Sequence, residues 1–563
     1  MERRALIGMA LMLLIILFYW ALFPGQKAPQ QPAPVEQGGA AGAGPGAVGG
    51  APGTQPVGGT VVQDSIAAAL SKAGFEIEKG TGREISVDTP LYTAMFSSRG
   101  GVLTSLRLKR YPGSDGNPVD IVPAATERPF GLVLLTVAGE RIDLAEAAFA
   151  PSVDRVLLQP GTDADLSFAL TTSSGLSIAK TFRFQSDNYL IMAELAVEGT
   201  GSAAVRALEF GWQPGLAPTE VNVKDDLRNF AALTLTDQTI VKNDPGKVLK
   251  NPSISVGGAI AWSGLRSKYF FVGFVPLEGE QVVARNFPGA AGAIGVAMDV
   301  DRSDAKPAQF MVYAGPLDYQ KLKQTGRGLE KAVDFGWKWL SPLSKLIFWF
   351  MIMCYKAIPN YGWVIIVLSA AIKFAFQPLT QKSMKSMREM QKLQPEIAAL
   401  KEKYKKEPQK MNTAMMELYR KRGINPLGGC LPLLLQMPVF FALFNVLSKT
   451  IELRRAKFIF WINDLSAPDV VATLPFSLPF IGSSLSLLPI LMGIAMYIQQ
   501  KMTPTDPKQA MMTYLLPIIF TFMFFKFPSG LVLYWLVNNV LTIVHQYLMD
   551  RADRRKQGAA QPA

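Results

Sequence analysis

Histidine, cysteine and acidic residues within the apolar stretches are what this chain has least of. It contains one histidine, His545, and two cysteines, Cys354 and Cys430. A single histidine excludes a zinc site of the His-Glu-x-x-His type, and a Ser/His/Asp triad needs its histidine beside a carboxylate. Two cysteines in or beside apolar segments imply no disulfide framework. Because the long apolar stretches also lack Asp and Glu, we expect no catalytic residues, no metal and no cofactor.

Length and charge indicate a membrane protein of several parts. A chain of 563 residues is too long for one hydrophobic core, so two or three units are expected. Hydrophobic residues make up 49% of the chain and the formal net charge is +13. Lys and Arg cluster beside apolar segments, which favours a topology signal over sequence-specific nucleic-acid binding.

The N-terminal 60 residues predict an anchor and a tether. Residues 1–23 place Arg3 and Arg4 before a long apolar run. This predicts a transmembrane anchor, since the run is longer than a cleaved signal peptide requires. Residues 24–60 are rich in Gly and Pro and predict a disordered linker, spanning roughly 33 Å as a coil.

Residues 61–325 predict an exported domain built from β-strands. Short segments of β character recur between turn signals, which is typical of an antiparallel sandwich. The strands expected from this pattern are 84–88, 166–171, 176–183, 189–197, 269–275 and 310–313. The domain contains no histidine or cysteine. We expect a structural domain, and a carbohydrate site remains open.

Residues 326–358 predict an amphipathic helix on the membrane surface. Trp337, Trp339 and Trp349 suit the interface, with lysines on the polar side. A spanning helix is the alternative, but it would place the basic loop that follows outside, against the positive-inside rule.

Five further spans are expected at 361–380, 424–447, 480–500, 510–526 and 530–549. With the anchor they give six transmembrane helices, five of them forming a core over 361–549, with both termini in the cytoplasm. The loop 381–423 carries twelve basic and five acidic residues, and a short basic tail fills 550–563. Arg454, Arg455 and Lys457 are the exception, since this topology places them outside.

Polar residues follow one face of several expected spans. Ser369, Lys373 and Gln377 are spaced by four, and so lie on one helix face. Lys373 is a costly charge within the membrane, which by default suggests a function. Alternatively, Lys373 has no function of this kind, and its side chain extends along the helix so that the amine reaches water. Gln436 and the stripe Trp535, Asn539, Thr542 and Gln546 suggest a hydrated cavity between helices, or ordinary interhelical hydrogen bonds.

The loop 381–423 predicts a helical hairpin. Met384, Met387, Met411 and Met415 belong to two apolar stripes separated by Pro408. The stripes can pack on each other, and flexible thioethers also suit varied apolar clients. The charged outer face, with Lys401 and Lys405, could meet anionic lipids or ribosomal RNA.

Three longer motifs carry a family resemblance. They are NPLGGCLPLLLQMPVFFAL from Asn425, FWINDLS over Phe460–Ser466 and FPSGLVL over Phe527–Leu533. With these stretches the chain resembles the YidC/Oxa/Alb family of membrane protein insertases, in its Gram-negative form with a large periplasmic domain. The resemblance implies a five-helix core after an anchor, a periplasmic β-supersandwich and a hydrophilic groove.

The resemblance also implies groove residues. Lys373 stands where the family commonly has arginine, so the charge is kept and the planar fork is lost. Ser369, Gln436, Tyr534, Trp535 and Asn539 match groove positions. Implied partners are nascent membrane proteins, the Sec translocon and, through the 381–423 hairpin, the ribosome, all at the bacterial inner membrane.

Several functions remain to be weighed against insertion. A Sec-associated folding chaperone without independent insertion activity would share these features. An ion-coupled transporter usually shows inverted repeats and intramembrane acids, and neither is found. An intramembrane hydrolase needs a nucleophile with a base or paired carboxylates, and a periplasmic carbohydrate-binding protein needs only residues 61–325.

Overall fold

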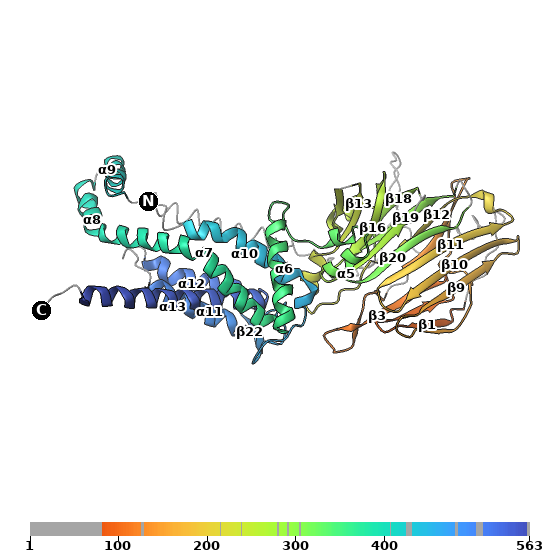
Figure 1. The fold of residues 1–563 in the computed structure, drawn as a ribbon. Coiled ribbons are helices and arrows are strands. Elements are labelled where there is room, and N and C mark those ends of the chain that lie inside the picture. The colour runs from red at the N-terminus through yellow and green to blue at the C-terminus, as the bar shows by residue number, and fades with distance from the viewer. Residues whose placement is uncertain are drawn as a thin grey trace, which may run out of the picture. The chain divides into compact units, whose positions relative to one another are not determined.

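The computed structural model describes residues 81–559, except 125–128, 214, 238, 278–280, 290–291, 303–305, 406, 424–430, 479–481 and 503–509. The expected anchor 1–23, the linker 24–60 and the end of the tail lie outside the described residues. Strands fill the first part of the described chain and long helices fill the second (Figure 1).

Three sheets make up the β-rich part, and all their strand pairs are antiparallel except β1 with β8. The first sheet has the order β4 (Pro118–Asp120), β3 (Val102–Pro112), β2 (Tyr92–Ser97), β1 (Glu84–Asp88), β8 (Arg155–Leu157). The second has the order β14 (Thr239–Asn243), β13 (Ala231–Thr236), β16 (Ile260–Arg266), β17 (Phe270–Pro276), β20 (Ala308–Pro316), β11 (Leu190–Gly199), β10 (Leu176–Gln185), β9 (Asp163–Thr171), β7 (Ala150–Pro151). The third has the order β15 (Ile254–Val256), β18 (Val282–Pro288), β19 (Ile294–Asp301), β12 (Val205–Trp212), β5 (Pro129–Thr136), β6 (Arg141–Asp143). Short helices connect them: η1 (Ser202–Ala204), α3 (Val223–Arg228), α4 (Pro245–Lys250), α5 (Tyr319–Gln324) and η3 (Leu329–Ala332).

The strands predicted from alternating residues lie within or closely overlap observed ones. β10 shows why: its burial alternates strictly from Leu176 to Phe184, as expected for a strand with one face on a core. Phenylalanines from all three sheets meet in that core. Phe182 of β10 packs against Phe96 of β2 at 5.3 Å and Phe130 of β5 at 5.2 Å, and Phe130 packs against Phe210 of β12 at 5.6 Å.

A lysine is buried beside these rings. Lys180 is fully buried, and its Nζ donates to the carbonyls of Gly100 at 2.9 Å and Phe130 at 2.7 Å. Phe130 has a φ of 64°, a left-handed conformation that is rare for a large side chain. Burial lowers the pKa of Lys180 to about 7, because desolvation disfavours the charged amine.

The helical part begins with α6 (Ser341–Ala357), which crosses the long helices steeply (Figure 1). It continues with α7 (Tyr361–Lys392), α8 (Gln394–Lys403), α9 (Pro408–Lys421), α10 (Leu431–Lys449), η5 (Ile451–Leu453), β21 (Val470–Leu478), β22 (Gly482–Ser486), α11 (Leu488–Met502), α12 (Ala510–Phe524) and α13 (Ser529–Ala559). Among the described residues, two stretches are long and apolar enough to cross a membrane, Tyr361–Ser383 and Ser529–Met549.

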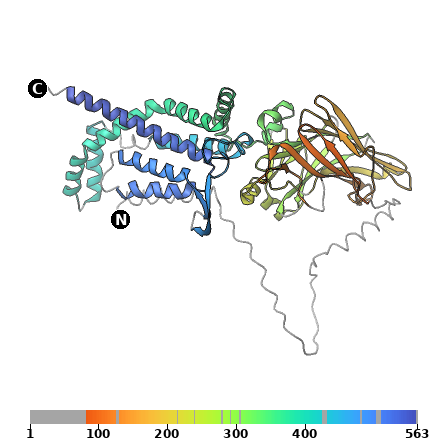
Figure 2. The same ribbon diagram turned by 90° about the horizontal axis from the view of Figure 1, so that it is seen from below.

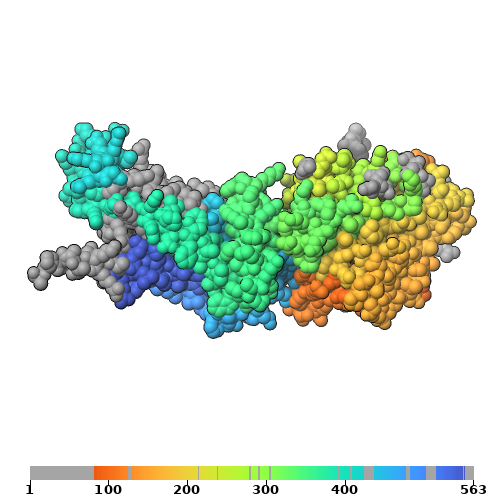
Figure 3. Space-filling model, in the orientation of Figure 1, coloured from red at the N-terminus to blue at the C-terminus, as the bar shows by residue number. Residues whose placement is uncertain are grey.

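Three expectations about this part were wrong in detail. An amphipathic helix was expected over 326–358, but only α6, from Ser341 to Ala357, is a long helix, and Trp337 and Trp339 precede it in a segment of turns. A helix was expected from residue 480, but β22 occupies Gly482–Ser486 and α11 begins at Leu488. The apolar, uncharged sequence concealed a hairpin, since hydropathy alone does not separate a short strand from a helix end. In the loop 381–423 one helix was expected before Pro408, but α7 runs on to Lys392 and α8 follows it. Figure 3 shows α8 and α9 protruding from the other helices.

The β-rich part contacts the helical part through the turn after α10. Arg454, whose side chain is 2% exposed, donates from Nε to Glu220 Oε1 at 2.7 Å and from Nη1 to the Pro112 carbonyl at 2.9 Å. Tyr269 donates to the Ser448 carbonyl at 3.3 Å. Arg454 stood out as a basic residue on the outer side of the expected topology, and this contact accounts for it.

Candidate functional site

The most unusual polar group of the helical part is the amine of Lys373. Its α-carbon lies twelve residues after Tyr361 and ten before Ser383, so it is near the middle of the apolar stretch of α7. Its Nζ donates to Thr542 Oγ1 of α13 at 2.6 Å. Thr542 is seven residues before Met549, about 10 Å along the helix axis. The extended lysine stem therefore ends between helices, short of the end of the apolar stretch.

The Thr542 hydroxyl also forms a hydrogen bond within its own helix, α13. It donates to the Asn538 carbonyl at 2.7 Å and accepts from Lys373. The hydroxyl thus bridges α13 and α7, which lie side by side in the views of Figures 1 and 2 and contact each other directly. A hydroxyl has one proton and two lone pairs, so it serves the ammonium as a neutral acceptor.

Within the described residues, Lys373 forms no ion pair with a carboxylate. The sequence of α7 between Tyr361 and Thr380, and those of α10, α11, α12 and the apolar stretch of α13, contain no Asp or Glu. His545 lies on α13, and its Nδ1 is buried without a hydrogen-bond partner among the described residues. It was not among the predicted site residues, because one histidine does not complete a catalytic motif. Its position three residues after Thr542 could have placed it at the site.

The other predicted residues of α7 and α10 divide into buried and half-buried positions. Ser369 is buried at 1% exposure and donates to the Ile365 carbonyl of its own helix at 2.7 Å. Gln377, one turn after Lys373, is half-buried. Gln436 of α10 is also half-buried, and Tyr534 of α13 is buried with no hydrogen-bond partner for its hydroxyl among the described residues.

The predicted residues of α13 have two different roles. Asn539 is 5% exposed, and its Nδ2 finds no hydrogen-bond partner among the described residues. Trp535 instead joins an aromatic cluster with Phe440 of α10 at 5.4 Å and with Phe520 and Phe524 of α12 at 6.0 and 5.4 Å. Trp535 therefore packs helices together, whereas Asn539 presents an unsatisfied donor, which is costly in an apolar setting.

The methionines of the 381–423 hairpin differ in how far they are buried. Met415 is 5% exposed and packs with Leu393, Ile397 and Tyr419 between α8 and α9. Met416, which lies outside the predicted stripes, is 59% exposed, and Met411 is half-buried. Met384 and Met387 lie in α7. Lys405 is exposed and Lys401 half-buried. For Met415 the structure thus matches the alternative that the stripes pack on each other.

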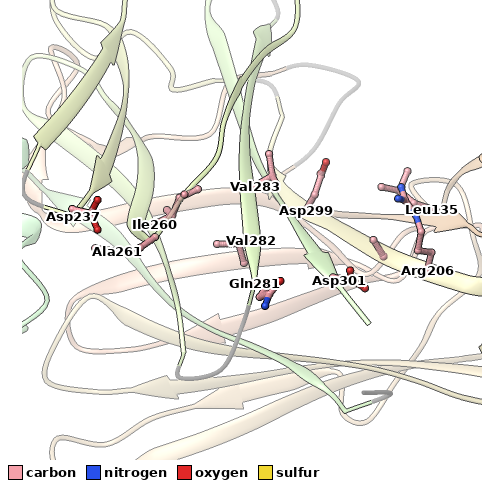
Figure 4. Close-up of a pocket in the computed structure, with 13 residues that line it drawn as sticks. Leu135, Arg206, Asp237, Ile260, Ala261, Gln281, Val282, Val283, Asp299 and Asp301 are labelled. Carbon is pink, nitrogen blue, oxygen red and sulfur yellow. The ribbon is translucent and has the colours of Figure 1, made fainter. Parts of the chain in front are cut away.

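A cavity of about 860 Å³ lies in the β-rich part and is lined by residues of β12, β16, β18 and β19 (Figure 4). Arg206 and three aspartates, Asp237, Asp299 and Asp301, line it with short apolar side chains and Gln281. No aromatic ring is among its lining residues, although ligand pockets are usually rich in them. In the described chain no three His, Cys, Asp or Glu side chains are grouped to hold a metal ion.

Two family models together match most of the chain. The model described as the 60Kd inner membrane protein matches residues 353–557, and that of the YidC periplasmic domain matches residues 84–350. The membrane protein insertase YidC of Pelobacter propionicus is 36% identical over 559 residues, covering 98% of this chain and 99% of the relative. That of Geobacter metallireducens is 37% identical over 565 residues, with coverages of 98% and 99%. The chain belongs to the YidC family.

Membership of this family gives the two parts their names. The strands of residues 84–350 form the periplasmic domain, and the helices belong to an inner membrane protein. The named relatives are insertases and not enzymes. Among solved structures, an active YidC insertase with its first transmembrane domain resolved is 20% identical, with a TM-score of 0.37 and coverages of 87% and 99%. A galactose mutarotase related enzyme from Lactobacillus acidophilus is 11% identical, with a TM-score of 0.29 and coverages of 41% and 97%.

Proposed function

We propose that this chain inserts nascent membrane proteins into the inner membrane through a hydrophilic groove between α7, α10 and α13. The observation that supports the proposal is the amine of Lys373, near the middle of the apolar stretch of α7, which bonds to a hydroxyl and to no carboxylate of the described residues. A cation at that depth is costly. A client's acidic segment entering from the cytoplasm would supply the missing counter-charge.

The groove needs no covalent chemistry to work. A polar segment crosses the bilayer slowly because hydrocarbon cannot hydrogen-bond to it. Lys373, Gln377, Gln436 and Asn539 would offer it polar partners over part of the path, which lowers the barrier. The client's apolar helix would meanwhile partition into lipid. Because lysine is a compact point charge, we expect attraction without the bidentate geometry of an arginine–carboxylate pair.

The arrangement in the membrane forms part of the proposal. The anchor 1–23 and α7, α10, α11, α12 and α13 would make six crossings, with both termini in the cytoplasm. α6 would lie on the outer surface, which its steep crossing of the long helices favours (Figure 1). The three sheets would form a periplasmic supersandwich. The basic hairpin 381–423 would face the cytoplasm, as the positive-inside rule requires.

The same arrangement suggests partners. The exposed basic face around Lys405 would meet anionic lipid headgroups or ribosomal RNA through charge rather than sequence. Longer clients would be received from the Sec translocon. A folding chaperone that always needs Sec is the second candidate, and the insertion assay with purified protein separates the two.

The test is insertion of a single-span client with a short acidic outer tail into proteoliposomes holding only this protein. We expect insertion by the wild type and by Lys373→Arg, and loss with Lys373→Ala and Lys373→Glu. Equal insertion by the wild type and the three variants would show that the charge of Lys373 is not needed for insertion. No insertion by folded wild-type protein, with activity restored by Sec, would favour the chaperone.

Thr542 offers a sharper test because the chain contains a matched control. Thr542→Val removes the acceptor for Lys373 together with a bond to the Asn538 carbonyl. Thr521→Val, in α12, removes only an equivalent bond to the Pro517 carbonyl. We expect Thr542→Val to impair insertion and Thr521→Val to spare it. Equal effects would mean that the hydroxyl contributes only to helix packing.

A further inference from the structure

A small sheet stands apart from the helices in the periplasmic turn between α10 and α11. Strands β21 and β22 pair only with each other, and the hairpin projects from the helical region in Figures 1 and 2. Val470, Val471 and Phe476 are 45%, 47% and 58% exposed. An isolated two-stranded hairpin is at best marginally stable in water, so this one requires a surface to lie on.

The hairpin lacks the charges that protect a water-facing edge. No charged residue occurs between Asp469 and Lys501. Soluble proteins blunt exposed edge strands with lysines and other charges, because a bare apolar edge pairs with other chains. Pro475 lies within β21, but the strand offers no other protection of that kind. The hairpin is therefore unsuited to open water.

The base of the hairpin is held firmly. Asp469 Oδ2 accepts hydrogen bonds from Trp461 Nε1 at 3.1 Å and from the backbone amides of Leu487 and Leu488 at 3.0 and 2.7 Å. One carboxylate thus closes the start of β21 against the beginning of α11. The exposed apolar side chains are presented by an anchored element and not by a loose loop.

A second apolar group lies beside this clamp. Phe460 is 85% exposed and stacks on Trp461 at 5.9 Å between ring centroids. Its φ is 55°, a conformation that costs a non-glycine residue energy and is held by its surroundings. Trp461, with an apolar ring and one polar N–H, is the kind of side chain enriched at membrane interfaces.

We propose that β21–β22 and Phe460 dip into the outer leaflet of the membrane and hold the insertase core at a fixed depth. The bound surface is lipid itself, at the boundary between headgroups and acyl chains. The hairpin cannot go deeper, because its unpaired strand edges need water or headgroups as hydrogen-bond partners. Lipid is favoured over a protein partner because the uncharged stretch continues directly into α11.

The test places an environment-sensitive fluorophore on single cysteines in the full chain. Cys354 and Cys430 are first replaced with alanine, which gives a parent chain without cysteine. The label is then attached to Phe476→Cys or to Val471→Cys. Val137→Cys, in a periplasmic β-turn and 66% exposed, is the matched control. The protein is reconstituted into neutral phosphatidylcholine vesicles with brominated acyl chains, and into a matched set containing phosphatidylglycerol.

We expect brominated lipid to quench most of the emission at 471 and 476, and iodide in the buffer to quench little. The label at 137 should show the reverse. Quenching should be equal in both vesicle types, because no charge of the hairpin takes part. Quenching by iodide at both hairpin positions would overturn the proposal. Protection of both positions from both quenchers would also overturn the proposal. If that protection occurs only at a high protein-to-lipid ratio, a second copy of the chain covers the hairpin. If it occurs at every ratio, another segment of the same chain covers it.

Folding of the labelled variants is checked by thermal unfolding against the cysteine-free parent. If Phe476→Cys unfolds early, Val471→Cys still decides the question. Insertion of a client is measured in the same vesicles, so that failure of the lipid contact and failure of the groove are seen separately.

Discussion

Arg454 donates to Glu220 at 2.7 Å, and the two residues are 234 positions apart in the chain. Their pairing fastens the turn after α10 to the periplasmic domain. The guanidinium also lies over the rings of Tyr269 and Phe270, at 5.8 and 5.4 Å. The end of the helix that carries Gln436 is therefore tied to a domain outside the membrane.

Arg454→Met should loosen this contact. Removing one partner of a buried ion pair typically costs about 3–5 kcal/mol, because the other charge stays buried and unpaired. We expect faster hydrogen exchange over residues 448–454 and in the segment around Glu220. Lys457→Gln, which removes an exposed charge three residues away, should have little effect. In the Arg454→Met background, Glu220→Gln should lower the free energy of unfolding by less than it does in the wild type. Equal losses in both backgrounds would show that the two residues are not coupled.

Lys180 should make the periplasmic domain more stable as pH rises. Its pKa is lowered to about 7 from an ordinary value of 10.5. Between these values the folded protein has released a proton that the unfolded chain still binds, so stability increases with pH. Thermal unfolding followed from pH 7 to 10 should show this rise in the wild type. Lys180→Met should be less stable overall, since two carbonyls lose their donor, and the rise should disappear.

Asp299 should act in the opposite direction and at lower pH. Burial, reinforced by Glu209, raises its pKa to about 6 from 3.8, against the opposing effect of Arg285. Between pH 4 and 6 the folded protein holds a proton that the unfolded chain has lost, so stability falls as pH rises. Asp299→Asn mimics the protonated form. We expect the variant to equal the wild type near pH 4 and to exceed it above pH 6 in unfolding temperature, and an equal dependence on pH in both would refute the assignment.

Met416 should contact clients and Met415 should not. Met416 is 59% exposed on α9, whereas Met415 is buried against α8. A photo-crosslinker at position 416 is expected to capture a nascent membrane segment. A photo-crosslinker at position 415 is expected to give no crosslink as long as the hairpin stays folded. Met415→Ala should speed hydrogen exchange over α8 and α9, since truncating a buried side chain typically costs about 2–5 kcal/mol. Efficient capture from 415 in a hairpin that still exchanges slowly would contradict this division.

The sequence predicted those features that repeat along an element. Segments of β character between turn signals located β1, β9, β10, β11, β17 and β20, and the four-residue spacing placed Ser369, Lys373 and Gln377 on one face of α7. It could not supply relationships between elements. Nothing local to Lys373 indicates that the Thr542 hydroxyl accepts a hydrogen bond from its amine. The periodicity of Met415 and Met416 does not say which of them the partner helix covers.

Composition misled where two structures share one pattern. Residues 470–486 are apolar and uncharged like the spans beside them, but Asp469 clamps both ends of the segment and closes a hairpin. Arg454 was an exception to the predicted topology, and it makes a tertiary contact with Glu220. In both cases the deciding interaction joins parts of the chain that no window of sequence contains.

The continuity of α7 has a mechanical consequence. One helix runs from Tyr361 through Lys373 to Lys392, so the lysine and the residues that lead into α8 belong to one element. A displacement of α8 would tilt this helix and shift the amine relative to Thr542 of α13. Pro378 lies between Lys373 and α8 and lacks the N–H that would bond to the Phe374 carbonyl. The helix therefore lacks one backbone hydrogen bond five residues from the lysine, which is the kind of position at which a long helix bends.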